Sequence, residues 1–157
     1  STRDPRGCSS ITAASGLSYT PLAADAGRYL RVRQIASNIA GTITRFSATS
    51  SVVAVAPALV IAPSIPSTPR VGRATKVGLG RFSGTAPLSY VYQWYLCGTP
   101  VASSSTKQSG CDAIDGASST TYSPIVSQRG SYLVLGVTVT NSAGELTFFT
   151  ASSPAVQ

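Results

Sequence analysis

The chain has 157 residues, and its 43% hydrophobic content is sufficient for a packed core, which excludes a chain that is disordered throughout. Only 11% of the residues are charged, against about 25% in an average soluble protein, and the net charge is +7. The basic residues form no run with interleaved aromatics, and no apolar stretch reaches about 18 residues. These two patterns exclude nucleic-acid binding and membrane insertion.

The sequence contains an internal repeat. Residues 7–54 match residues 110–157 without a gap, each residue n of the first stretch falling on residue n + 103. Residues 66–109 have no counterpart ahead of residue 7, and the chain contains no Met. We therefore expect the chain to begin in mid-module and to be part of a longer translation product. The identities include these pairs: Cys8 and Cys111, Tyr19 and Tyr122, Tyr29 and Tyr132, Asn38 and Asn141.

This layout predicts three parts: residues 1–55 as the C-terminal half of a module, residues 56–69 as a connector and residues 70–157 as a complete module. In the first part, Leu30 and Val32 alternate with polar residues and indicate a strand. The stretch 38–41 supplies Asn and Gly for a tight reversal, and the chain returns over 43–47. The connector carries four prolines, which favour an extended and semi-stiff path.

The complete module has the same strand signal. Large apolar residues alternate along 90–96 and again along 133–139, which places them on one face of each strand. The stretch 141–144 predicts a second hairpin turn with a returning strand over 145–150. No segment shows helical periodicity. Short strands separated by Gly and Pro turns favour an all-β sandwich built from antiparallel sheets.

Residues 66–157 resemble the bacterial immunoglobulin-like repeats found in tandem in large surface and secreted proteins of the actinobacterial type. The resemblance rests on motifs that cover nearly the whole module: 71–72 (Val-Gly), 82–84 (Phe-Ser-Gly), 89–97, Cys111 with Ile114, 119–124 and 138–144. It implies tandem immunoglobulin-like β-sandwiches, the first represented only by its C-terminal half.

The resemblance also implies structural roles for the aromatic residues. Trp94 would be the core tryptophan of the third strand, and four tyrosines would pack in the sandwich or across strands: Tyr19, Tyr29, Tyr122 and Tyr132. No Cys stands two residues after Tyr29 or Tyr132, so the inter-sheet disulfide of antibody domains is absent. Asp25 aligns with Gln128, which favours a structural role at this position over a functional site.

The three cysteines fit the half-module layout. Cys97 and Cys111 bracket a loop rich in Gly, Ser and Thr and are expected to close it with a disulfide. Cys8 is the repeat equivalent of Cys111, so its expected mate is a cysteine of an upstream or neighbouring segment. The alternative is that Cys8 stays reduced. We do not expect it to be catalytic, because the chain contains no His to activate it.

The same lack of His argues against an enzyme, and we predict no catalytic residue, cofactor or metal site. The best candidate for a basic patch consists of Arg28, Arg31 and Arg33. A solvated strand face is the preferred interpretation of these arginines, and an anionic cell-wall or surface polymer is the functional alternative.

The sequence leaves three functional hypotheses. The first is a spacer or stalk section with an adhesive role in an extracellular or cell-surface protein, where neighbouring modules are the partners. The second is a subunit of a self-assembling fibre or particle surface, in which strands of a neighbouring copy complete the half-module. The third and weaker hypothesis is a carbohydrate-binding accessory module, which would require exposed aromatic residues arranged flat on one sheet.

Overall fold

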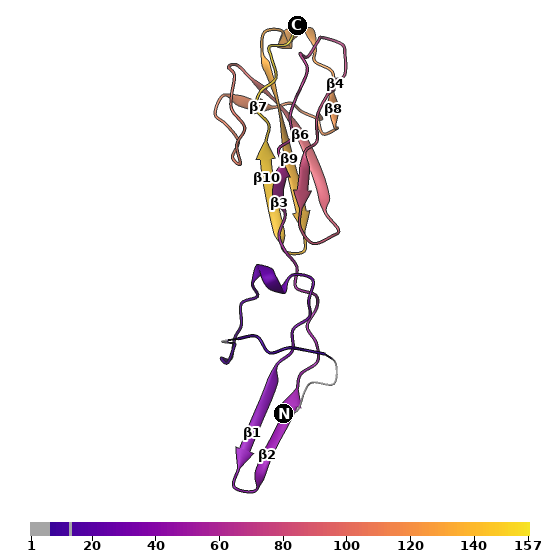
Figure 1. Cartoon of the computed structure of the whole chain (residues 1–157). Helices are drawn as coiled ribbons and strands as arrows, with labels where there is room; N and C mark the ends of the chain where they lie inside the picture. The colour runs from indigo at the N-terminus through magenta and orange to yellow at the C-terminus, as the bar shows by residue number, and fades with distance from the viewer. Residues whose placement is uncertain (1–6, 13) are drawn as a thin grey trace. The chain divides into compact units, whose positions relative to one another are not determined.

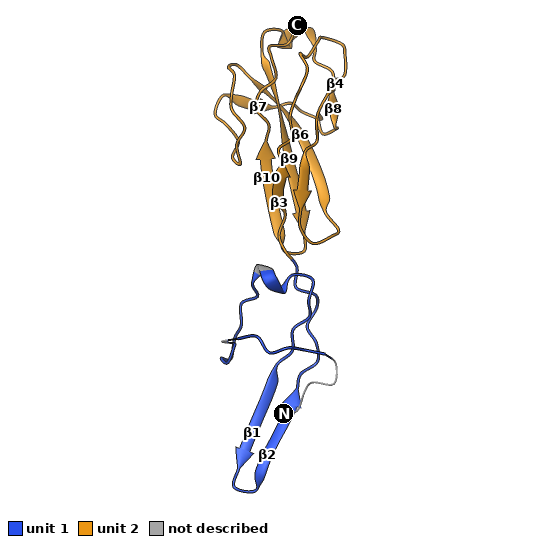
Figure 2. Ribbon diagram, viewed as in Figure 1, with its two compact units in different colours: residues 1–54 blue, residues 55–157 orange. Residues whose placement is uncertain are grey.

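The regular secondary structure of the protein is almost entirely β, and the strands of the described residues pair antiparallel. The computed structural model describes residues 7–12 and 14–157, so the first six residues of the predicted half-module lie outside the described part. The chain divides into two compact units, Ser1–Ala54 and Val55–Gln157 (Figure 2). This boundary lies next to the one predicted from the repeat.

The first unit contains one short 3-10 helix and one hairpin. The helix η1 spans Ala23–Asp25, and the hairpin consists of β1 (Arg33–Asn38) and β2 (Gly41–Phe46). Gly41 closes the turn with a φ of 148°, as the predicted reversal requires. Among the described residues, no further strand lies beside this hairpin (Figure 1).

The second unit consists of two layers of strands. Its larger sheet has the order β10-β9-β6-β7 (Figure 1). Two short strand pairs, β3 with β5 and β4 with β8, lie outside this sheet, and Phe82 of β5 and Tyr122 of β8 belong to the same core cluster as its buried residues. The predicted strands over 90–96, 133–139 and 145–150 correspond to β6, β9 and β10. The elements are β3 (Ala58–Ile61), β4 (Thr75–Lys76), β5 (Arg81–Ser83), β6 (Ser89–Cys97), β7 (Cys111–Ala113), β8 (Thr121–Tyr122), η2 (Val126–Gln128), β9 (Tyr132–Asn141) and β10 (Gly144–Phe149).

The core of the second unit follows from the alternation along β6 and β9. Trp94 is completely buried, its Nε1 donates a hydrogen bond to the carbonyl of Ser119 (2.8 Å), and its ring packs against Tyr122. Alternate residues of β9 from Leu133 to Val139 surround it, and Phe82 closes the core from the opposite layer. The predicted core role of Trp94 is therefore confirmed.

The predicted connector over residues 56–69 is wrong as a separate linker, because these residues belong to the second unit. β3 pairs with β5, and Ile65 lies in the core. Three of the four prolines in this stretch are buried: Pro57, Pro63 and Pro69. Proline lacks an N–H and suits an edge strand, so the residues that suggested a spacer instead pack as apolar groups along the rim of the sandwich.

The two units form equivalent hydrogen bonds at positions related by the internal repeat. The amides of Leu30 and Leu133 donate to the hydroxyls of Ser50 and Ser153, each over 3.0 Å, and each serine amide donates back to the corresponding leucine carbonyl, each over 2.8 Å. The helices η1 and η2 and the hairpins β1–β2 and β9–β10 are also offset by 103 positions. The first unit therefore repeats the backbone arrangement of the second unit from η2 to β10, while its described residues form no strands equivalent to β7 and β8.

The two units differ in burial. None of the described residues over 7–54 has a buried side chain among those assessed, whereas Leu133, Val134 and Leu135 are completely buried. Val32, the equivalent of Leu135, is 69% exposed. Tyr29 is 63% exposed, while its equivalent Tyr132 is partly buried, so the expectation that Tyr29 packs in a core is wrong for this structure. The physical reason is that the residues covering Tyr132 have no counterpart over 7–54.

Candidate functional site

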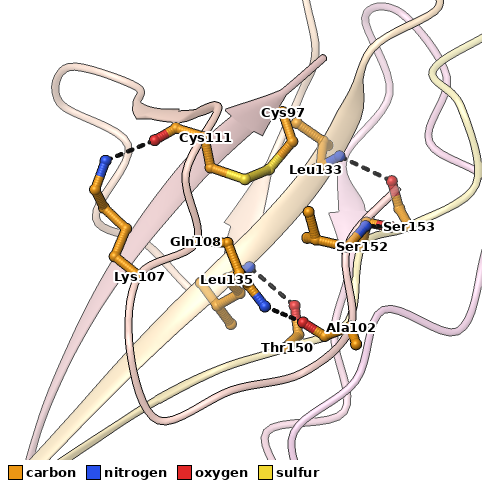
Figure 3. The surroundings of a disulfide bond; sticks show 11 residues. Cys97, Ala102, Lys107, Gln108, Cys111, Leu133, Leu135, Thr150, Ser152 and Ser153 are labelled. Atoms are coloured by element: carbon orange, nitrogen blue, oxygen red, sulfur yellow. Dashed lines mark hydrogen bonds between the residues drawn. A yellow bond between two sulfur atoms is a disulfide. The ribbon is translucent and has the colours of Figure 1, made fainter. Parts of the chain in front are cut away.

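The first notable feature is the disulfide loop of the second unit. Cys97 and Cys111 end β6 and begin β7, are nearly fully buried and form the predicted disulfide across 14 positions (Figure 3). The ammonium group of Lys107 donates a hydrogen bond to the carbonyl of Cys111 (2.8 Å), and the side-chain amide of Gln108 donates to the carbonyl of Ala102. The loop is therefore closed by a covalent bond and ordered by its own side chains.

This loop covers the part of the large sheet's outer face that lies next to the disulfide. Ser104 exchanges two backbone hydrogen bonds with Phe149, over 2.7 and 3.1 Å, and the Val101 amide donates to the hydroxyl of Ser152 over 3.1 Å. A second apolar cluster forms beneath the loop and includes Val134 and Phe149 with the two cysteines. The arrangement anchors the loop to the C-terminal end of β10 and buries this apolar cluster.

The second feature is the uncovered hairpin of the first unit. β9 pairs with β10 on one side and with β6 on the other, whereas β1 pairs only with β2 within the described structure. The face equivalent to the sandwich core, which we call the open face, consists of Leu30, Val32, Gln34, Ala36, Ile43 and Arg45. Its largest β-branched members remain substantially exposed: Val32 at 69% and Ile43 at 48%. An open strand edge beside an exposed face with several apolar side chains is a surface suited to binding another polypeptide.

The predicted basic patch belongs to this hairpin. Arg31 is half-buried: its Nε donates to the carbonyl of Ser47 (2.8 Å), and its guanidinium lies 5.3 Å from the centre of the Phe46 ring. Arg28 and Arg33 are exposed. The alignment of the repeat places Arg31 on the buried Val134 and Arg33 on Gly136. The aligned sequence alone contains this contrast, a cation against an apolar residue or a glycine, and it marks the outer side of the hairpin as different in the two units.

Asp25 and Gln128 have the same structural function, as their alignment predicted. The Asp25 carboxylate accepts hydrogen bonds from the Tyr19 hydroxyl (2.7 Å) and the Leu22 amide (2.8 Å). The Gln128 carbonyl accepts the equivalent bonds from Tyr122 and Ile125. The amide of Leu22, followed by the Tyr19 hydroxyl, lowers the pKa of Asp25 below its ordinary value. Both residues stabilise the turn before the long strand, and Tyr19 contributes to this turn through its hydroxyl, not by packing in a sandwich core as expected.

The disulfide loop and the open face are the two candidate sites, because the described residues show no metal-binding or sugar-binding arrangement. These residues contain no cluster of three or more potential metal ligands, and no helix formed by them is long and apolar enough to cross a bilayer. Among them the exposed aromatic residues, Tyr29 and Tyr90, lie in different units, so they form no flat row on one sheet. Cys8 is exposed in the first unit.

Comparisons with protein-family models, curated proteins and solved structures gave no match for this chain.

Proposed function

We propose that this chain is a section of an extracellular bacterial protein built from immunoglobulin-like modules, and that it acts as a spacer or stalk with an adhesive role. The observation that carries the proposal is the recurrence of one hydrogen-bond pattern in two units 103 positions apart. A repeated structural unit without catalytic equipment is typical of proteins that set distances between other parts.

The disulfide supports the extracellular assignment. Structural disulfides persist in oxidising compartments and are rare in the cytosol of ordinary bacteria. Cys97 and Cys111 are both 1% exposed, and the loop they close covers an apolar cluster, so the bond is integrated into the fold. The low charge content and the absence of His from the sequence fit a structural protein.

The test is to locate the protein in the organism that produces it. Antibodies against the second unit are used on secreted, surface and cytosolic fractions, with thiol-reactive labelling to read the state of Cys97 and Cys111. The proposal expects the signal in the surface or secreted fraction with both cysteines oxidised. A cytosolic protein with both cysteines reduced would overturn it.

A second candidate function is favoured by the open edge of β1. A neighbouring chain that donates strands to this edge would join copies into a fibre or particle surface. Sedimentation of the purified chain over a hundredfold range of concentration separates the two candidates. Concentration-dependent polymers support the fibre, and a monomer at all concentrations supports the spacer.

A further inference from the structure

We infer that Asn38 binds the polypeptide that covers the open face, by donating hydrogen bonds from its side-chain amide to two backbone carbonyls of that polypeptide. The occupant is the N-terminal half of a module of this fold, equivalent to residues 55–103, and it comes from a segment that is not part of residues 1–157. This inference rests on the proposed function, because it assumes that the first unit is half of a module.

Asn141, the repeat equivalent of Asn38, shows this contact in a covered hairpin. Its Nδ2 donates hydrogen bonds to the carbonyls of Val55 (2.7 Å) and Thr85 (2.9 Å), which lie 86 and 56 positions away in the sequence. The Thr85 amide donates to the Val55 carbonyl over 3.0 Å, and the Thr85 hydroxyl accepts from the Val55 amide over 2.8 Å. One side-chain amide therefore ties the turn between β9 and β10 to two segments of the covering half, the residues ahead of β3 and the connection from β5 to β6.

Asn38 makes the same contacts within its turn but lacks the contacts to a cover. Its Oδ1 accepts a hydrogen bond from the Ala40 amide over 2.9 Å. The Asn141 Oδ1 accepts from the Ala143 amide over the same 2.9 Å. Among the described residues, none accepts a hydrogen bond from the Asn38 Nδ2, and Asn38 is exposed where Asn141 is half-buried. The turn thus uses only the oxygen of Asn38, and its NH2 group can bind carbonyls of a covering segment.

Binding through backbone carbonyls suits a hairpin whose other facing residues differ from those of the second unit. Gln34 stands where the second unit has Val137, and Arg45 stands where it has Phe148. A cover that fits these residues has side chains other than those of residues 55–103, but it still presents main-chain carbonyls. An amide NH2 group supplies two donors and can bind two carbonyls at once. Asn38 can therefore hold a half-module of a different sequence.

The second unit also shows that this contact requires a glycine in the cover. Gly84 directly precedes Thr85 and has a φ of 150°, which residues with a side chain rarely adopt. A Cβ at Gly84 would lie 3.2 Å from the Asn141 Nδ2 and 3.2 Å from the Cα of Pro57. We therefore expect a glycine at the equivalent position of the polypeptide that Asn38 binds.

A second copy of the chain does not suit as the occupant, because the halves do not balance. Each copy contains two C-terminal halves, in residues 7–54 and 104–157, and one N-terminal half, in residues 55–103. In the second unit this N-terminal half already covers its own hairpin, and β6 pairs with β9 from Ser89 to Cys97. Copies that exchanged this half would still leave one uncovered hairpin per chain. The occupant therefore comes from outside residues 1–157.

The test uses the whole chain with a copy of residues 55–103 added directly ahead of Ser1, which aligns with Ser104, so that the fusion restores the repeat register. Because the probe is the chain's own N-terminal half, the first hairpin is given the residues of the second unit at positions that this half would contact. The substitutions are Arg31→Val, Arg33→Gly, Gln34→Val and Arg45→Phe.

Four proteins are compared: the substituted chain with and without the added copy, each with Asn38 or with Asn38→Asp. Aspartate keeps the oxygen that accepts the hydrogen bonds of the turn and removes both amide donors, so it separates the turn from the contact with the cover. The unmodified chain with Asn141→Asp provides the reference for a covered hairpin. The readout is amide hydrogen exchange over residues 33–38, and protection of the second unit in the same protein is the control for folding.

We expect exchange over residues 33–38 to slow when the copy is added. Asn38→Asp should speed this exchange at least about tenfold with the copy and change it less than about twofold without the copy. Asn141→Asp should speed exchange over residues 136–141 at least about tenfold. An equal effect of Asn38→Asp with and without the copy would overturn the inference. Fast exchange in both proteins that carry Asn38 would instead overturn the half-module on which the proposed function rests.

The source of the occupant is tested on the unmodified chain. Exchange over residues 33–38 is measured over a hundredfold range of concentration. The inference expects equally fast exchange at every concentration, because identical copies cannot supply the missing half. Protection that rises with concentration would overturn this part of the inference and identify a second copy as the occupant.

Discussion

The paired serines Ser153 and Ser50 allow one hydrogen bond to be tested in two environments. Ser153→Ala removes the acceptor of the Leu133 amide in a buried setting, where Leu133 has no solvent exposure. A buried amide left without an acceptor costs about 1–3 kcal/mol. Ser50→Ala removes the equivalent acceptor of the Leu30 amide, but that bond is exposed and water replaces it. The expected cost of Ser50→Ala is therefore below about 0.5 kcal/mol.

Urea unfolding followed by the fluorescence of Trp94, the single tryptophan, measures the stability of the second unit. With a urea dependence of about 1–3 kcal/mol per molar, a loss of 2 kcal/mol lowers the midpoint by about 1 M in Ser153→Ala. Amide exchange at Leu30 and Leu133 provides the comparison between units. Leu133 should lose protection in Ser153→Ala, while Leu30 should exchange rapidly with or without Ser50. Equal protection of the two amides in the unmodified chain would refute the reasoning.

Three further predictions concern particular contacts. Replacing both Cys97 and Cys111 by Ala should lower the free energy of unfolding by about 3 kcal/mol, measured by urea unfolding, because the disulfide closes a loop of 14 positions; an unchanged midpoint would contradict this. Gly136→Ala should cost about 1–3 kcal/mol in the same assay because its Cβ would lie 3.0 Å from the Phe149 ring, and full stability would show that the ring moves aside. A carbon-detected NMR titration should place the pKa of Asp25 below the ordinary aspartate value. The stabilisation of its turn should therefore be present above that ordinary pKa and be lost as the pH falls through the folded-state pKa; an Asp25 pKa at or above the ordinary value would contradict this.

Several features of the fold could be predicted because they are local. Alternation along β6 and β9 indicated which side chains face the core, and Trp94 is completely buried as expected. The Asn and Gly residues at 38–41 and 141–144 predicted both hairpin turns, and Gly41 and Gly144 have positive φ angles. Spacing alone brought Cys97 and Cys111 together, since a 14-position loop between adjacent strands leaves their backbones close.

The predictions that proved wrong concern features that depend on residues distant in the sequence. Four prolines over 56–69 suggested a linker, but whether a proline-rich stretch spans a gap or packs on a sheet edge depends on the strand beside it, here β5. Tyr29 and Tyr132 occupy equivalent positions of the repeat and have similar neighbours in the sequence. They differ in the residues that cover their side chains, and the local sequence does not encode this cover. The position of Arg31 over Phe46 has a signal in the sequence, because the aligned residue of the second copy is the apolar Val134.

The most direct test of the central claim is hydrogen exchange of the unmodified chain, comparing residues 33–38 with residues 136–141. If the first unit is half of a module whose open face is not covered by the described part of the chain, the first hairpin should exchange at least about a thousandfold faster than the second. Comparable protection in the two hairpins would contradict the account, because it would show that the first unit forms a stable core of its own.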